Sequence, residues 1–355
     1  MRYLGPGSMI FRVRPVTRVL LVVVVALAGV GVPLAATASE APIVEFEVPT
    51  PGSAPTAVAV DPQGNVWFTE FLGNKIAVMT PAGEFTEYPL PNPPPSQPGV
   101  SGSRPDGITV DLEGNIWFTE EATGKVGKLA PSGDLTEYTP PTGSAGSGIC
   151  IGPDANVWFT EYAADKIGRV TSAGVFTEFA LPGGARPYQI VGGPDGNLWV
   201  IESETNRIAK VTTTGIVTEY DIPTAFAAPS GITAGPDGNL WFTEFRASQV
   251  AKITTSGIVT EYAIPTAPSG PNKITTGPDG NLWFTELDGN NVASITTDGA
   301  VTEYPVPSAQ SNPGGIAAGP GASVSFAESH ANQLGRLPTS GMAPAPIEAL
   351  PTFTG

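Results

Sequence analysis

The chain has 355 residues, of which 41% are hydrophobic, 43 are glycine and 38 are proline. A chain of this length can bury a sizeable core, so we expect the glycines and prolines to separate short strands rather than to mark disorder. The 33 acidic residues outnumber the 17 basic residues and give a net charge of -16. Such a surface repels phosphate backbones and anionic membranes, which excludes nucleic acid as a partner and leaves cationic ligands and divalent metals open.

The first 38 residues have the pattern of an export signal. Arg12, Arg14 and Arg18 precede an apolar run over residues 19–32, and no acidic residue occurs before Glu40. The small residues at 36–38 then offer a cleavage site. We expect residues 1–38 to be removed and the mature protein to be secreted, extracellular or periplasmic, without stable membrane insertion. The alternative is a retained membrane anchor, because the apolar run is near the lower length limit for a span.

The single cysteine, Cys150, cannot form an internal disulfide. It lies between two isoleucines, without a histidine or basic residue beside it. These surroundings predict a small buried hydrophobic residue, with a reactive thiol as the alternative.

A tetrapeptide of the form Trp-Phe-Thr-Glu recurs through the rest of the chain. All six tryptophans occupy its first position, and a degenerate seventh copy begins at Ser325. The copies begin at residues 67, 117, 158, 199, 241, 283 and 325. Apart from the first interval the spacing is 41 or 42 residues, a period that is typical of β-propeller blades when the content is strand-like.

The fifth copy shows the order of elements within one repeat. Short apolar segments at 231–234, 240–244, 250–254 and 258–264 alternate with turn sequences rich in Gly, Asp and Ser. Four short antiparallel strands joined by such turns form one blade. No segment predicts an amphipathic helix, so the sequence predicts an all-β, seven-bladed propeller of four-stranded antiparallel blades over residues 39–340.

The closure of the ring is ambiguous, because the fourth-strand pattern occurs eight times. The extra copies lie at 43–48 and at 346–350. A closed propeller leaves no free sheet edge, and the N-terminal copy alternates better. We therefore expect it to complete the seventh blade, with 341–355 as a tail, the reverse assignment being the alternative. The long first interval is due to a Pro/Ser/Gly stretch at 91–103, a candidate lid or a passive surface loop.

Each repeated residue has a structural interpretation. The tryptophans are expected to pack between blades. The Gly-Pro-Asp-Gly-Asn sequences are expected to be turns capped by aspartate, with calcium binding as the alternative. The glutamates of the Thr-Glu-Tyr triplets lie on the outermost strand, where they protect the sheet edge.

A second set of glutamates ends the second strand of every blade. Sevenfold repetition predicts a ring of carboxylates near one face, held by backbone amides or by basic residues of the third strand, or else available for function. The glutamates are Glu70, Glu120, Glu161, Glu202, Glu244, Glu286 and Glu328. The basic residues are Lys75, Lys125, Lys166, Arg207 and Lys252.

The repeat resembles that of the streptogramin B lyases, also called virginiamycin B lyases. The resemblance is carried by Gly-Pro-Asp-Gly-Asn-Leu-Trp-Phe-Thr-Glu at 235–244, by third strands such as 165–170 and by Thr-Glu-Tyr-x-Ile-Pro-Thr at 260–266. It covers about residues 45–340. It implies a propeller that binds a cyclic depsipeptide over the mouth of the central channel and opens its ester by elimination. It also implies a divalent metal, normally magnesium, and two histidines, each following a proline just before an innermost strand.

The corresponding positions of this chain contain no histidine. They are Thr56, Asp106, Ser147, Tyr188, Ser230, Asn272 and Gly314. In the last two blades, where the family keeps its histidines, the chain has Asn272 and Gly314. Asn312 replaces one metal-binding glutamate of the family, and Glu328 corresponds to the other, so Glu328 is the candidate metal ligand.

His330, the only histidine of the chain, follows Glu328 closely and is the candidate catalytic base, with an exposed loop histidine as the alternative. Asp106 and Tyr188, preceded by Arg104 and Arg186, are expected to face the channel mouth as ligand contacts. The remaining candidate ligand contacts are Ser230, Asn272 and Asn312.

Two functions remain open at this point. The first is a secreted, monomeric propeller that binds a small molecule, a peptide or a surface partner on its channel face without chemistry. The second is a diverged metal-dependent lyase of the virginiamycin B type, or a hydrolase, that uses Glu328, His330 or Asp106. The replaced histidines favour binding. A lactonase-type propeller is less favoured, because no Glu/Asn/Asp set stands out at its centre.

Overall fold

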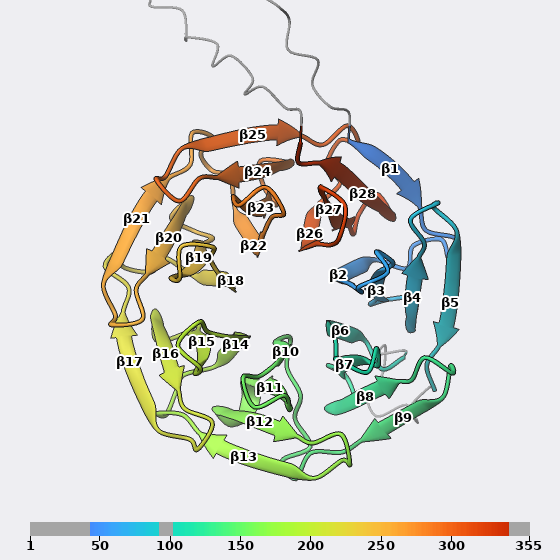
Figure 1. Cartoon of the computed structure of the whole chain (residues 1–355), viewed down its shortest axis with the longest axis horizontal. Coiled ribbons are helices and arrows are strands. Elements are labelled where there is room, and N and C mark those ends of the chain that lie inside the picture. Colours follow the sequence, from blue (N-terminus) through green and yellow to red (C-terminus); the bar gives the residue numbers. More distant parts are fainter. Residues whose placement is uncertain (1–42, 92–101, 341–355) are drawn as a thin grey trace, which may run out of the picture. The chain divides into compact units, whose positions relative to one another are not determined.

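The computed structural model describes residues 43–91 and 102–340. Three predicted features lie outside the described residues: the signal peptide at 1–38, most of the Pro/Ser/Gly loop, and the C-terminal segment that contains the second candidate closing strand. Seven four-stranded antiparallel sheets form a ring around a central channel (Figure 1). The predicted all-β, seven-bladed propeller is therefore confirmed.

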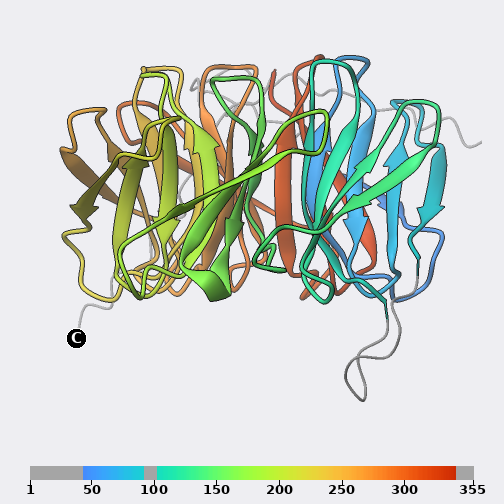
Figure 2. The same ribbon diagram turned by 90° about the horizontal axis from the view of Figure 1, so that it is seen from below.

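In blades 1 to 6 the strands run from the channel outward in chain order, and in Figure 2 the blades stand side by side. Blade 1 consists of β2 (Pro55–Val60), β3 (Val66–Glu70), β4 (Lys75–Met79) and β5 (Phe85–Pro89). Blade 2 consists of β6 (Pro105–Val110), β7 (Ile116–Glu120), β8 (Lys125–Leu129) and β9 (Leu135–Tyr138). Blade 3 consists of β10 (Ile149–Ile151), β11 (Val157–Glu161), β12 (Lys166–Val170) and β13 (Phe176–Ala180). Blade 4 consists of β14 (Pro187–Gly192), β15 (Leu198–Glu202), β16 (Arg207–Val211) and β17 (Val217–Asp221).

The remaining blades repeat this order. Blade 5 consists of β18 (Pro229–Ala234), β19 (Leu240–Glu244), β20 (Gln249–Ile253) and β21 (Val259–Ala263). Blade 6 consists of β22 (Pro271–Thr276), β23 (Leu282–Glu286), β24 (Asn291–Ile295) and β25 (Val301–Pro305). Blade 7 consists of β26 (Pro313–Ala318), β27 (Ser323–Glu328), β28 (Gln333–Pro338) and β1 (Val44–Glu47). The one helical element of the described part is a three-residue 3-10 turn, Tyr162–Ala164.

The ring closes through the N-terminal strand. β1 pairs antiparallel with β28, with Phe46 opposite Leu334 and Glu45 opposite Gly335. The backbone amide of Ser53 also donates to Asn332 Oδ1 at 2.8 Å. These contacts join segments 279 to 290 residues apart and confirm the N-terminal copy as the closing strand. Among the described residues, no helix is both long and apolar enough to cross a membrane.

The core lies between neighbouring blades, where the tryptophans pack. Trp199 of blade 4 belongs to one cluster with Leu240 and Phe242 of blade 5. Its indole nitrogen donates to Asp195 at 3.0 Å, and its ring stacks on Tyr220 of the fourth strand at 5.8 Å. The same arrangement recurs in the other tryptophan-bearing blades, which confirms the packing prediction. In blade 7 the buried Ser325 stands at this position.

The turn between the first and second strands is capped as predicted. The Asp195 carboxylate accepts from the backbone amide of Asn197 at 3.3 Å and from its side-chain amide at 2.9 Å. Partial burial acts to raise the pKa of Asp195, but the hydrogen bonds from the Trp199 indole and from Asn197 outweigh it and lower the pKa. The aspartates therefore serve as structural caps that position each tryptophan.

Candidate functional site

The mouth of the channel is built from a repeated backbone device. In six blades the residue before the first proline of the innermost strand has a positive φ of 47° to 59°. These residues are Ala54, Arg104, Arg186, Ala228, Gly270 and Asn312. A left-handed residue before proline is uncommon, and such strain persists where the surrounding structure fixes it. In each of these blades a register shift between the first and second strands follows the proline, so the next side chains are turned out of the regular sheet pattern.

In four blades the carbonyl of the residue after the proline accepts a hydrogen bond from a threonine of the preceding blade. Thr69 Oγ1 donates to the carbonyl of Asp106 at 3.0 Å, and Thr243 Oγ1 donates to that of Asn272 at 2.5 Å. The threonine of the Trp-Phe-Thr-Glu repeat thus fixes the backbone of three predicted site residues, Asp106, Tyr188 and Asn272. This role explains why the threonine recurs although it is fully buried.

A groove of about 880 Å³ lies over this end of blades 2 to 6. Its aromatic walls are Tyr162, Tyr188 and Phe245. Its polar residues include Ser147, Ser230 and Asn272, and its charged residues are Glu121, Glu204 and Arg246. The groove has the size and mixed character of small-molecule sites.

The predicted ligand contacts divide between this groove and the channel beneath it. Tyr188, Ser230 and Asn272 line the groove, and Ser230 Oγ donates to Asn272 Oδ1 at 2.7 Å. Asp106 lines the adjoining channel cavity instead. The predicted residues of blades 2, 4, 5 and 6 are therefore neighbours around one opening.

The two predicted arginines are stacked on aromatic rings. The Arg104 guanidinium lies 5.5 Å from the centre of the Phe71 ring, and that of Arg186 lies 5.4 Å from the Tyr162 ring. Neither forms an ion pair within the described part of the chain. Arg186 is exposed next to the Tyr162 wall of the groove, so it can reach an anionic group at the rim.

The chain matches the model of the virginiamycin B lyase family over residues 43–337. It belongs to this family. A crystal structure of virginiamycin B lyase from Staphylococcus aureus is 36% identical, covers 84% of this chain and 99% of its own, and superposes with a TM-score of 0.78. A streptogramin B lyase structure is 37% identical over 84% of this chain and 99% of its own, with a TM-score of 0.77.

A third structure is that of a catalytically inactive histidine-to-alanine variant of the Staphylococcus aureus lyase with quinupristin. It is 35% identical, covers 84% of this chain and 99% of its own, and has a TM-score of 0.78. No curated protein matches the chain significantly.

Within this member of the virginiamycin B lyase family, the predicted base and metal ligand lie apart from the groove. His330 is exposed in the loop after β27, and its backbone amide donates to the Ser311 carbonyl at 3.0 Å. Asn312 donates from its side-chain amide to Ser329 Oγ at 2.6 Å. The groove and the channel cavity are not lined by His330, Asn312 or Glu328.

Glu328 is the seventh member of the predicted carboxylate ring. Its side chain is fully buried and faces Glu45 of the outermost strand. Burial and the Glu45 charge raise the pKa of Glu328 to about 7. Magnesium retains several bound waters, which a fully buried carboxyl cannot accommodate, and the described residues contain no group of three or more His, Cys, Asp or Glu side chains suited to a metal. This donor set does not fit magnesium, so the expectation of that metal rests on the family resemblance alone.

All seven ring glutamates are fully buried and point toward an outer-strand glutamate of their own blade rather than into the channel. The third-strand cations bond the outer glutamates: Lys75 Nζ lies 2.6 Å from Glu87. The outer glutamates also accept hydrogen bonds from the loop that enters their blade from the preceding blade, as Glu87 does from the Thr50 amide at 3.1 Å. These contacts correct two expectations. The cations of blades 1 to 4 pair with the outer glutamates rather than with the ring glutamates. Lys252 pairs with neither and lies over the Trp241 ring at 5.2 Å.

Several site residues were not singled out from the sequence. Tyr162, Phe245 and Glu121 each follow directly on a Trp-Phe-Thr-Glu motif. This position differs from blade to blade, while the motif before it is nearly constant. A variable position beside a constant motif could have indicated these residues as ligand contacts. Glu121 lies near Asp106, and burial and this neighbouring charge raise the pKa of Glu121.

Cys150 behaves as predicted. It is half-buried against the cluster around Trp158 and Ile190. Burial raises the pKa of its thiol to about 12, so the thiolate is not populated at neutral pH.

Proposed function

We propose that this protein is a secreted, monomeric member of the virginiamycin B lyase family that binds an amphiphilic small molecule or peptide in the groove without chemical turnover. The observation that carries the proposal is the groove of about 880 Å³, with three aromatic walls and amide and hydroxyl groups between them. Aromatic side chains supply contact area at low entropic cost, and a few polar groups fix orientation. The relative crystallised with quinupristin supports a cyclic peptide of that kind as the first ligand to test.

Binding is favoured over chemistry by the position of the single histidine. His330 is exposed and does not line the groove, so the imidazole that would act as general base does not face the proposed ligand. The titratable side chains that line the groove are Glu121, Tyr162, Tyr188, Glu204 and Arg246. The glutamates suit a cationic substituent of the ligand, whose attraction weakens as salt rises.

The binding test is a calorimetric titration with quinupristin, with and without magnesium. We expect micromolar affinity that does not require the metal. Tyr162→Ala removes an aromatic wall and should weaken binding by about fivefold or more. Leu112→Ala removes an exposed apolar side chain in the turn between β6 and β7, outside the groove, and should leave affinity unchanged. Absence of binding, or equal affinity of both variants, would overturn the proposal.

A diverged lyase is the second candidate, favoured by 36% identity to virginiamycin B lyase over nearly the whole of that enzyme. If turnover occurs, the first candidate bases to replace are Glu121 and His330. Burial and the neighbouring Asp106 raise the pKa of the Glu121 carboxyl. Chromatography with mass detection distinguishes the outcomes. Elimination gives a product of unchanged mass and altered retention, hydrolysis gives a product heavier by one water, and pure binding leaves the antibiotic unaltered.

A further inference from the structure

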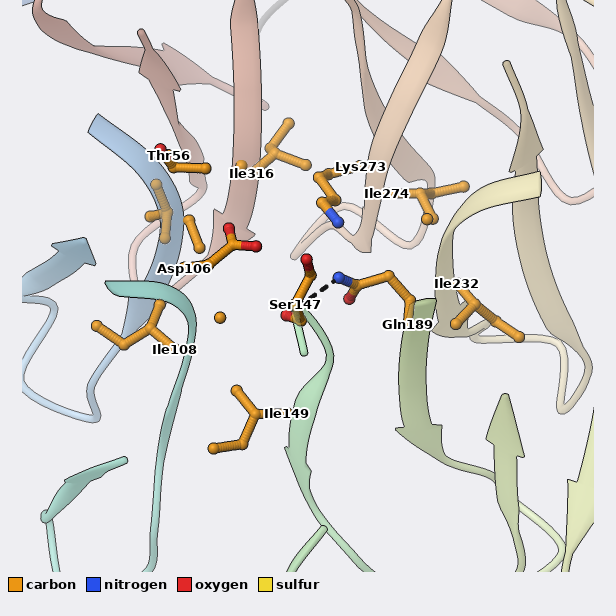
Figure 3. A pocket seen from close by; sticks show the side chains of 15 residues that line it. Thr56, Asp106, Ile108, Ser147, Ile149, Gln189, Ile232, Lys273, Ile274 and Ile316 are labelled. Atoms are coloured by element: carbon orange, nitrogen blue, oxygen red, sulfur yellow. Dashed lines mark hydrogen bonds between the residues drawn. The ribbon is translucent and has the colours of Figure 1, made fainter. Parts of the chain in front are cut away.

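A second, smaller cavity lies in the channel beneath the groove. Its volume is about 120 Å³, and it adjoins the groove at Ser147, which lines both. The upper walls are polar, with Asp106, Ser147, Gln189 and Lys273 directed toward one another (Figure 3). Other parts of the wall are aliphatic and include isoleucines at the same position of five innermost strands. These are Ile108, Ile149, Ile232, Ile274 and Ile316.

Two opposite charges face this cavity without partners. Asp106 comes from blade 2 and Lys273 from blade 6, so they approach from different sides of the channel. Neither forms an ion pair among the described residues. Lys273 Nζ lies over the face of Tyr188, 4.5 Å from the ring centre. Charges that are partly removed from water without a partner are costly unless something else satisfies them.

The propeller framework does not require a lysine at this position. The equivalent residues of blades 2, 5 and 7 are Gly107, Gly231 and Gly315, where an added Cβ would meet a carbonyl of the next blade at 2.3 to 2.5 Å. Blade packing therefore favours glycine, and Lys273 and Gln189 depart from that pattern. Gln189 Nε2 donates to the Ser147 carbonyl at 3.3 Å, which fixes its amide beside the cavity.

We propose that this cavity binds a free α-amino acid with a short aliphatic side chain. The ammonium group lies on the Asp106 carboxylate, the carboxylate on the Lys273 ammonium, and the side chain on the isoleucine walls. The volume corresponds to about four waters of ~30 Å³ each, which suits a molecule of about five to eight non-hydrogen atoms. A zwitterion satisfies both orphaned charges at once, which a simple anion or cation does not. The site is independent of what the groove binds.

The test is titration of the protein with L-alanine, followed by saturation-transfer NMR. L-alanine should bind, whereas N-acetyl-L-alanine and L-alanine amide, each of which lacks one charge, should bind about tenfold or more weakly. Absence of L-alanine binding at about 10 mM, or equal binding of acetate and L-alanine, would overturn the proposal. The ligand series needs no variant, so it remains decisive if a variant misfolds.

Variants then assign the two charges. Asp106→Asn should weaken L-alanine and alanine amide, which both present an ammonium group, and should leave N-acetylalanine unchanged. Lys273→Met should weaken L-alanine and N-acetylalanine, which both present a carboxylate, and should leave alanine amide unchanged. Lys128→Met is the matched control, because Lys128 also covers an aromatic ring, Trp117, but lies on β8 away from the channel. If Lys128→Met loses L-alanine binding as Lys273→Met does, the assignment fails. Tyr162→Ala separates the proposals, since it should weaken quinupristin and leave L-alanine unchanged.

Discussion

Blades 1 to 4 and blades 5 to 7 solve the same electrostatic problem in different ways. Every blade buries a second-strand glutamate against an outer-strand glutamate. In blades 1 to 4 the third strand begins with a cation, and in blades 5 to 7 it begins with an amide. The cations are Lys75, Lys125, Lys166 and Arg207. The amides are Gln249, Asn291 and Gln333.

The difference is visible in the titration of the buried carboxyls. Burial and the facing Glu87 raise the pKa of Glu70 to about 7, while Lys75 lowers it. Burial and Glu261 raise the pKa of Glu244 to about 8, with no opposing cation. In blade 7 burial and Glu45 raise the pKa of Glu328 to about 7, and the Ser311 hydroxyl opposes the rise. Both carboxyl oxygens of Glu244 lack a hydrogen-bond partner, as do those of Glu70 and Glu328, so a proton on these carboxyls avoids burying an unpaired charge. Burial therefore raises the pKa of the second-strand glutamate in every blade, and the third-strand cations of blades 1 to 4 oppose this rise.

The largest expected effect is on the pH dependence of stability. A carboxyl whose folded pKa is about 7 or 8 binds a proton that the unfolded chain releases near pH 4.5, so stability falls as pH rises from about 5 to 8. The lowered pKa values of turn aspartates such as Asp195 act oppositely and matter only below about pH 4. Calorimetry should show Tm falling by about 10 °C or more between pH 5 and pH 9. A flat profile over this range would contradict buried, protonated pairs.

Glu244→Gln should remove the titration of the buried carboxyl in blade 5. Gln keeps the shape and hydrogen-bonding capacity without a charge to bury at high pH. The variant should exceed the wild type in stability by about 3 kcal/mol at pH 9 and match it near pH 5. Denaturant unfolding at both pH values measures the difference, and an equal effect at the two values would assign it to packing instead.

Lys75→Met should give blade 1 a glutamate pair without a neighbouring cation, as in blades 5 and 6. Loss of the ammonium 2.6 Å from Glu87 leaves two facing carboxylates and raises the pKa of Glu70 further. We expect a loss of about 2 kcal/mol at pH 8, discounted because both side chains are about one-fifth to one-quarter exposed. Lys128→Met, which removes a lysine outside these pairs, is the control. Equal losses in the two variants would break the comparison between the blades.

Gln249→Lys should supply blade 5 with the missing cation. The lysine would face Glu261 and lower the pKa of Glu244 toward that of Glu70. The expected gain is about 1 kcal/mol at pH 8 and disappears near pH 5, where the pair already holds a proton. Carboxyl titration by NMR of labelled glutamate checks the direction of the shift.

Much of this architecture could be predicted from the sequence. The 42-residue period, the Asp-capped turns and the tryptophan position specify four short strands per repeat, because each is a local pattern that recurs in every blade. The closing strand was also accessible, since its alternation fits an edge that must be covered. The described structure agrees with these expectations at β1 and at the stacking of Trp199 on Tyr220.

The site was only partly predictable. Tyr188, Ser230 and Asn272 were found because fold logic directs the start of each innermost strand to the channel mouth. Phe245 and Lys273 were missed, since their side chains meet the others only across blades. The assignment of cations to the second-strand glutamates failed in detail, because the partner of Lys75 is set by strand pairing and side-chain direction rather than by distance along the chain.

By itself the sequence determined the blade, its repetition and the polar character of the channel mouth, because these follow from local periodicity and turn chemistry. Only the tertiary structure decided which face each glutamate turns to and which residues of different blades share a cavity. The physical reason is that ring closure brings together side chains more than 100 residues apart, such as Asp106 and Lys273. Their proximity is fixed by blade packing and appears in no stretch of the sequence.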